Sequence, residues 1–168
     1  AMMYSYDVTA VNHSHKGKAA TSNAVMYGNG YEVPWTEKFD NASSLNMFTI
    51  VDANNDGSTW GWSRFKTKAV TYTYNDKNAA DDWLITPPIA LKAGKKYKLT
   101  FDEHVTNSEY PEKLEIKYGN GLDYAAYTEV MSKTTFTNAD FETKTIYFTP
   151  TTDGNYHIGF HACSDANN

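Results

Sequence analysis

The segment from Asp52 to Gly57 contains the side chains best suited to binding a metal ion. Asp52, Asn54 and Asp56 supply oxygen atoms at its first, third and fifth positions, and Gly57 permits a sharp turn at the sixth. Hard oxygen ligands at this spacing are typical of the first half of a calcium-binding loop. The twelfth position, where such a loop needs a bidentate glutamate, is Ser63, so the segment is not an EF-hand. Calcium binding and a plain turn capped by Asn and Asp side chains remain two open hypotheses.

The acid, base and nucleophile candidates do not form a catalytic set. Asp81 precedes Asp82, and Asp102 precedes Glu103, but adjacent residues of a strand face opposite sides, whereas acid–base catalysis needs a shared pocket. His157 and His161 are four apart in a predicted strand, which separates them by about 13 Å, too far to share a metal ion. The single cysteine, Cys163, has no accompanying oxyanion motif. We therefore predict that the chain is not an enzyme; an enzyme would need a pocket with converging carboxylates.

Aromatic side chains are the other candidates for ligand contact. The chain has 13 Tyr, 8 Phe and 4 Trp, more than a small core requires. Exposed aromatic rings on a strand face or in loops can stack on a ligand such as a sugar. Trp60 and Trp83 are expected in the core. The candidates for ligand binding are Tyr72 and Tyr74 on one strand face, and Tyr110, Tyr124 and Tyr127 in loops.

Composition excludes several classes of partner. The 168 residues carry a net charge of -5, and Arg64 is the only arginine, whereas proteins that bind nucleic acid are basic and rich in arginine. No stretch approaches the roughly 20 apolar residues that a membrane span needs. One cysteine excludes an intrachain disulfide. We expect neither nucleic-acid binding nor membrane insertion, and a fold that depends on its core alone.

These side chains must be positioned by β-strands. Residues 4–10 alternate apolar and polar side chains, and 19–27 form a second strand, which together predict a hairpin. From Val33 onward, short apolar runs recur between turns of Asn, Asp and Gly, which predicts an all-β sandwich, jelly roll or barrel. One short turn of helix is expected within 123–131. The eight runs are 48–51, 60–65, 69–74, 83–85, 97–104, 114–118, 143–148 and 156–162.

The first 28 residues resemble the end of a fibronectin type III domain. The matching text is Tyr4-Ser-Tyr-Asp-Val-Thr-Ala-Val-Asn12, followed by Gly17 in a turn and Ser22 in a last strand. The resemblance implies that 1–28 are the C-terminal hairpin of such a domain, and that Tyr4 is its tyrosine-corner residue. The alternative is an ordinary hairpin that belongs to the main domain.

Residues 33–168 resemble the choice-of-anchor J, or cleaved adhesin, domains of Bacteroidetes surface proteins. The motifs are Trp35-Thr-Glu-Lys-Phe39, the 48–57 segment followed by Trp60, Asp82-Trp-Leu-Ile-Thr-Pro-Pro88, and Tyr97-Lys-Leu-Thr-Phe101. The resemblance implies a jelly-roll β-sandwich over 29–168. Family members usually continue past 160–168 into one further apolar strand, and here that strand is either absent or cut off.

The resemblance also implies a function. We expect a non-catalytic, extracellular or cell-surface module that adheres to host protein or glycan beside other domains of its parent protein, with calcium as a structural ion. Jelly-roll binding domains often hold calcium between their first and last strands, which makes Glu37 and Asp40 a second candidate site. Three residues apart in an extended strand, these two face opposite sides, so at most one would bind without a bend. The alternative function is a carbohydrate-binding or spacer domain attached to a secreted protease or glycoside hydrolase.

Overall fold

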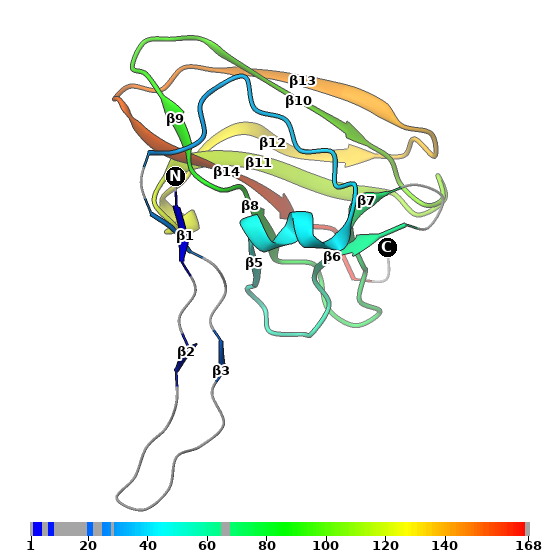
Figure 1. Cartoon of the computed structure of the whole chain (residues 1–168). Coiled ribbons are helices and arrows are strands. Elements are labelled where there is room, and N and C mark those ends of the chain that lie inside the picture. The colour runs from blue at the N-terminus through cyan, green and yellow to red at the C-terminus, as the bar shows by residue number, and fades with distance from the viewer. Residues whose placement is uncertain are drawn as a thin grey trace, which may run out of the picture.

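The computed structural model describes residues 2–4, 7–8, 20–21, 25–27, 29–64 and 68–166. Four short strands lie in the first 27 residues (Figure 1). β1 (Met2–Tyr4) pairs with β4 (Val25–Tyr27), and β2 (Asp7–Val8) pairs with β3 (Ala20–Thr21), both antiparallel. The pairing confirms the predicted hairpin; its expected turn around Gly17 lies outside the described residues. The fibronectin type III relationship and the domain boundary at residue 28 stay predictions.

The larger layer of the main fold is a six-stranded sheet. Its strands run in the order β12-β11-β14-β8-β5, and β9 also pairs with β14, all antiparallel. β14 therefore lies in the middle of the sheet, although it is the last strand in the sequence. The members are β5 (Thr49–Asp52), β8 (Asp82–Ile85), β9 (Ile89–Leu91), β11 (Glu112–Asn120), β12 (Thr128–Phe136) and β14 (Gly154–Ala162).

A two-stranded sheet forms the facing layer. β10 (Tyr97–Glu103) pairs with β13 (Glu142–Phe148), and Figure 1 shows this pair above β11, β12 and β14. Alternation along both strands buries every second side chain against the sheet below. The inward residues Tyr97, Leu99, Phe101, Ile146 and Phe148 pack against a buried cluster of Ile89, Leu91, Ile116, Tyr156 and Ile158. The predicted all-β sandwich is confirmed.

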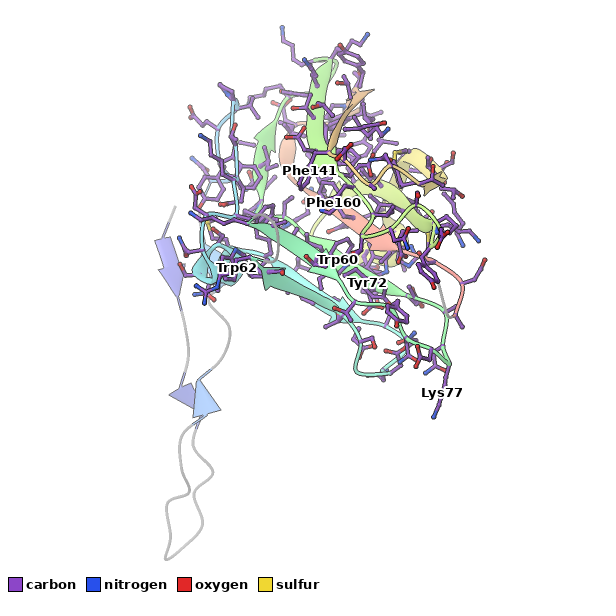
Figure 2. The ribbon with its side chains drawn as sticks, turned by 90° about the vertical axis from the view of Figure 1, so that its right-hand side faces the viewer. Trp60, Trp62, Tyr72, Lys77, Phe141 and Phe160 are labelled. Atoms are coloured by element: carbon purple, nitrogen blue, oxygen red, sulfur yellow. The ribbon has the colours of Figure 1, made fainter. Side chains whose placement is uncertain are left out.

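A second strand pair flanks the sandwich. β6 (Trp60–Ser63) pairs with β7 (Ala69–Tyr72), and the rings of Trp60 and Tyr72 meet edge to face at 5.9 Å (Figure 2). The strand predicted over 69–74 is thus shorter in the structure, where it ends at Tyr72. Among the described residues, no helix is long and apolar enough to span a membrane.

The short turn of helix expected within 123–131 is present as the 3₁₀ helix η2 (Tyr124–Ala126). Three elements were not predicted, and the first is β12, which begins at Thr128. Two register shifts in the pairing of β11 with β12 break regular alternation, which obscured this strand in the sequence. The 3₁₀ helix η1 (Ala42–Met47) and the short strand β9 after Pro88 were also not predicted.

Candidate binding surfaces

The loop from Asp52 to Ser58 is a turn that caps its own backbone. Asp52 accepts the backbone N–H groups of Asp56 at 3.1 Å and of Gly57 at 2.9 Å, one on each carboxylate oxygen. Asp56 accepts the N–H of Ser58 at 2.8 Å. The Asn54 side chain accepts the N–H of Asp56 and donates to the Ala79 carbonyl at 2.7 Å. These bonds account for the Asn and Asp spacing as a capped turn.

A buried carboxylate lies beside this loop. Asp82 pairs with Asp52 in the β5–β8 ladder and is fully buried. Its Oδ1 has no hydrogen-bond partner among the described residues, and the same holds for two buried hydroxyls, Thr59 Oγ1 and Tyr72 OH. Burial raises the pKa of Asp82, and the charges of Asp52 and Asp56 raise it further. The other carboxylate oxygen of Asp82, Oδ2, accepts the backbone N–H of Asp81 at 3.3 Å. A buried carboxylate with one free oxygen is costly, so this cluster is the position at which a cation would be most useful.

The same carboxylates act on Tyr72. Burial raises the pKa of the Tyr72 hydroxyl above its ordinary value, and Asp82, Asp56, Glu112 and Asp52 raise it further, in that order. Four acidic side chains therefore place negative potential at this one buried hydroxyl. As the side chains stand, no group of three or more His, Cys, Asp or Glu residues within the described part of the chain is arranged to hold a metal ion.

Glu37 and Asp40 have different partners. Glu37 accepts the backbone N–H of Phe39, whose φ of 53° is in the left-handed region, at 2.6 Å. Asp40 lies 3.7 Å from Lys68 in an exposed ion pair. Glu37 thus caps a strained backbone position, whereas Asp40 pairs with a lysine on the surface. The two carboxylates do not form one site.

Two of the five candidate tyrosines belong to a second small core. Tyr127 is only 7% exposed, and its ring packs edge to face against Trp83, while Tyr124 lies 5.0 Å from Trp83. The loop that carries η2 folds back over the outer face of β8, β11 and β14, so these residues cover Trp83. The enclosed ring of Tyr127 leaves little surface for ligand contact, and Tyr124 is half-buried against the same tryptophan. Ligand binding by these two residues stays a prediction. Trp83 is buried, as predicted.

The other three candidate tyrosines are not gathered into one surface. Tyr74 and Tyr110 are exposed, at 53% and 57%, in separate loops after β7 and β10. Tyr72 is half-buried at the end of β7, and its hydroxyl is enclosed. Tyr74 lies beyond the end of that strand, so the expected shared strand face of Tyr72 and Tyr74 is absent from the described ladder.

The histidine and acid candidates are engaged in structural contacts. His161 stacks on Trp83 with ring centroids 4.2 Å apart, and its two nitrogens contact Glu115 at 2.6 Å and Asp81 at 2.8 Å. His157 points elsewhere, with its Nδ1 donating to the Thr86 carbonyl at 2.6 Å. The two histidines therefore have separate partners, as the strand spacing predicted.

Cys163 and the acidic pair of β10 are similarly engaged. Cys163 is buried, which raises the pKa of its thiol. Asp102 accepts a hydrogen bond from Thr143 at 2.5 Å on the outward side of β10. Glu103 points inward and pairs with Lys144 at 3.3 Å. The two carboxylates thus face opposite sides of the strand, as predicted from their adjacent positions.

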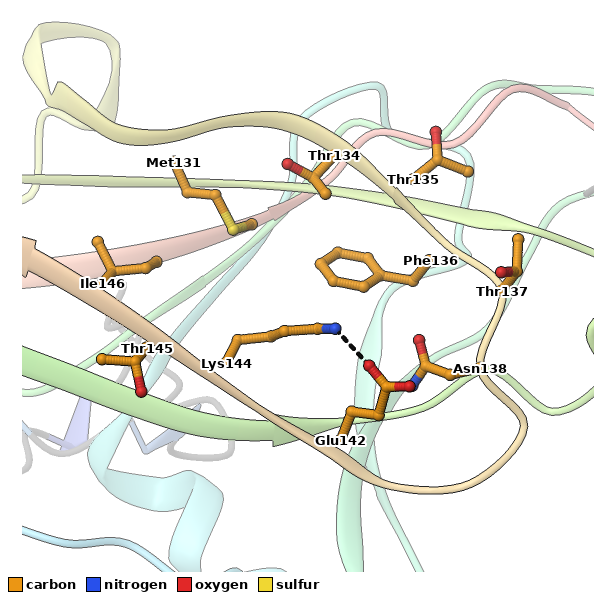
Figure 3. A pocket seen from close by; sticks show the side chains of 10 residues that line it. All are labelled: Met131, Thr134, Thr135, Phe136, Thr137, Asn138, Glu142, Lys144, Thr145 and Ile146. Atoms are coloured by element: carbon orange, nitrogen blue, oxygen red, sulfur yellow. Dashed lines mark hydrogen bonds and ion pairs between the residues drawn. The ribbon is translucent and has the colours of Figure 1, made fainter.

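A groove of about 440 Å³ opens between β12 and β13, where the two layers of the sandwich separate (Figure 3). Its apolar side chains are Met131, Phe136 and Ile146. Lys144 enters it from β13, is bonded to Glu142 at 2.6 Å, and lies 5.5 Å from the Phe136 ring. The remaining lining is mostly hydroxyl and amide groups: Thr134, Thr135, Thr137, Thr145 and Asn138.

Sequence reasoning missed this groove. Its walls come from two different layers, so no single motif contains them. The available signal was the polar run Thr134-Thr-Phe-Thr-Asn138, in which hydroxyl and amide side chains flank one aromatic ring. Asn138 fixes the turn between the two walls, since its side chain donates to the carbonyls of Glu103 at 3.1 Å and Asp140 at 3.0 Å.

Comparison with known proteins identifies the fold. No protein-family model and no curated protein sequence matches the chain. Among solved structures, the K1 cleaved adhesin domain of Lys-gingipain from Porphyromonas gingivalis W83 is similar with a TM-score of 0.56 and 19% identity, over 71% of this chain and 82% of that one. The K3 cleaved adhesin domain of the same protein gives a TM-score of 0.53 and 18% identity over the same shares. The chain shares the fold of these adhesin domains, in agreement with the sequence motifs.

Proposed function

Starting from its cleaved adhesin fold, we propose that the chain is a non-catalytic binding module that works outside the cell, where it attaches its parent protein to a host protein or glycan. The observation that carries the proposal is the groove between β12 and β13. Hydroxyl, amide and charged groups surround an apolar floor there, and such a mixture suits a ligand that has both apolar faces and many hydrogen-bonding groups.

The acid and base groups support a non-catalytic role. The groove contains one carboxylate, Glu142, and that group is bonded to Lys144. A pair of carboxylates facing one another across a bound substrate, as glycoside hydrolysis requires, is not found among its lining residues. The groove is therefore suited to holding a ligand rather than to cleaving it.

Binding to immobilised glycans and matrix proteins tests this function. We expect the purified chain to bind at least one of them, and Thr134→Val and Thr137→Val to weaken that binding by roughly tenfold, because both change polar lining groups. Asn78→Ala, in an exposed loop outside the groove, is the matched control. Thermal unfolding must show that each variant is folded. No binding to any ligand would overturn the function, and binding unaffected by both groove variants would place the site elsewhere.

Calcium is the structural ion that this proposal includes. Asp52, Asp56 and Asp82 would supply its carboxylate ligands after turning from the contacts described above, since carboxylate oxygens are ligands that calcium prefers. The unpartnered Oδ1 of the buried Asp82 supports this position over the capped turn alone. Glu37 and Asp40 are not needed for it. Bound calcium would neutralise the buried charge and tie the 52–58 loop to β8.

A further inference from the structure

The outward face of the β10–β13 pair, which we call the ribbon face, carries two exposed aromatic rings. Tyr147 lies in β13 and is 55% exposed, and Phe141, just before that strand, is 48% exposed. Phe141 packs against His104, the residue after β10, with ring centroids 4.3 Å apart. Six residues of extended chain separate the two rings by about 20 Å. That distance is long enough for several linked sugar rings.

The residues between the two rings are polar and open to solvent. The β10–β13 register places Thr100 opposite Thr145 and Asp102 opposite Thr143, and all four are exposed. The inward neighbours of these residues fill the core, so the ribbon face contributes little to packing. Three hydroxyl groups and the Asp102 carboxylate lie between the two aromatic rings, and that carboxylate accepts a hydrogen bond from Thr143 at 2.5 Å. Such a row is suited to a chain of sugars, whose C–H faces pack on rings while their hydroxyls form hydrogen bonds.

Positive charge gathers at the Tyr147 end of the ribbon face. Lys96 Nζ lies 4.6 Å from the centre of the Tyr147 ring, and Lys98 is directly opposite Tyr147 in the register. The nearby carboxylate of Asp153 is occupied by Lys92, 3.0 Å away. The whole chain has a net charge of -5, so the sign of this local charge is opposite to that of the chain as a whole. Charge complementarity therefore favours an anionic ligand.

We propose that the ribbon face binds a linear acidic polysaccharide, with one sugar ring stacked on Tyr147 and its carboxylate paired with Lys96 and Lys98. The polysaccharide then runs along Thr145 and Thr143 toward Phe141. This proposal goes beyond the groove, because the two share only Thr145 among their residues and the ribbon face is defined by outward side chains. An acidic peptide would need the lysines but not the exposed ring, which distinguishes the two ligands experimentally.

Affinity electrophoresis with polygalacturonate in the gel tests the proposal, with neutral dextran and poly-glutamate as comparison probes. We expect polygalacturonate to retard the wild-type chain and dextran to leave its mobility unchanged. Tyr147→Ala and the double variant Lys96→Ala with Lys98→Ala should each weaken binding by roughly tenfold. Binding should also weaken as salt rises, because the ion pairs are exposed. The matched controls are Leu122→Ala, an exposed apolar residue outside the ribbon face, and Lys77→Ala, exposed in the loop after β7 (Figure 2).

Two results would overturn the proposal. One is the absence of polygalacturonate binding by the folded chain, and the other is binding that Tyr147→Ala leaves unchanged while poly-glutamate binds equally well. In both cases the groove variants Thr134→Val and Thr137→Val report on the proposed function independently. If the wild-type chain binds a glycan or matrix protein and the groove variants lose that binding, the ribbon-face proposal fails but the proposed binding function stands. If the wild-type chain binds no ligand at all, both proposals fail.

Discussion

Gly119 of β11 lies directly against the ring of Tyr127. A Cβ atom at position 119 would come within 2.2 Å of Tyr127 Cδ1, a distance that no real contact allows. On the neighbouring strand β14, a Cβ at Gly159 would lie 3.0 Å from the Trp83 ring. Two glycines on adjacent strands thus form the surface on which Tyr127 and Trp83 pack. The second core therefore requires glycine at positions 119 and 159 as well as the two aromatic rings.

Gly119→Ala should destabilise the fold by about 1–3 kcal/mol, because the added methyl group must displace the Tyr127 ring. The matched control is Gly61→Ala in β6, where a Cβ would meet no atom within 4 Å. That variant should stay within about 0.5 kcal/mol of the wild type. Urea unfolding measures both. Equal stabilities for the two variants would contradict the close packing of Tyr127.

Tyr127→Phe should cost about 1 kcal/mol of stability and leave ligand binding unchanged. The hydroxyl donates to the Gly121 carbonyl at 2.6 Å, and a single buried hydrogen bond contributes about that much. Burial raises the pKa of Tyr127 to about 12, so the hydroxyl stays protonated as a donor over the usual pH range. Unfolding and binding are measured on the same preparation. A loss of binding without a loss of stability would show that Tyr127 contacts the ligand after all.

His157 should lower the stability on acidification through the pH range just below 6.5, whereas the raised pKa values of Asp82 and Glu112 act in the opposite direction. Burial lowers the pKa of this histidine below its ordinary value of 6.5 in the folded chain. In that range the histidine of the unfolded chain binds a proton that the folded chain does not, so its contribution to the free energy of unfolding decreases as pH falls. His157→Gln keeps a donor for the Thr86 carbonyl and should reduce the slope of stability against pH. An unchanged slope in urea unfolding series across this range would count against a buried neutral His157.

Calcium should raise the unfolding temperature by several degrees relative to excess chelator. A ligand at about a hundred times its dissociation constant stabilises the folded state by about 2.7 kcal/mol. Asp82→Asn should abolish the shift, whereas Asp76→Asn, at an exposed position in the loop after β7, should retain it.

In chelator, Asp82→Asn should be at least as stable as the wild type, because burial disfavours the Asp82 charge and raises its pKa. This comparison separates loss of a calcium ligand from simple damage to the fold. A wild-type chain that melts at the same temperature with calcium and with chelator would remove calcium from the proposal and leave 52–58 as a capped turn.

Local pattern was sufficient to predict the strands, since alternation in 97–101 and 114–118 reports directly which side of a sheet is buried. It failed at β12, where register shifts disrupt the alternation, and it did not reveal that Tyr127, which follows a turn signal, returns to the sheet. The groove and the unpartnered Oδ1 atom of Asp82 could not be predicted, because both depend on strands that are distant in sequence. Whether a polar side chain has a partner depends on those distant strands rather than on its neighbours along the chain.

The central place of β14 determines when this module can fold. β8 and β11 both pair with β14 rather than with one another, so the β5–β8 and β11–β12 pairs remain unconnected until residues 154–162 are available. A nascent chain would hold two separate sheet fragments until β14 had been synthesised. Until then the strand edges of β8 and β11 that pair with β14 stay unpaired, and unpaired edges are sites at which another chain can aggregate.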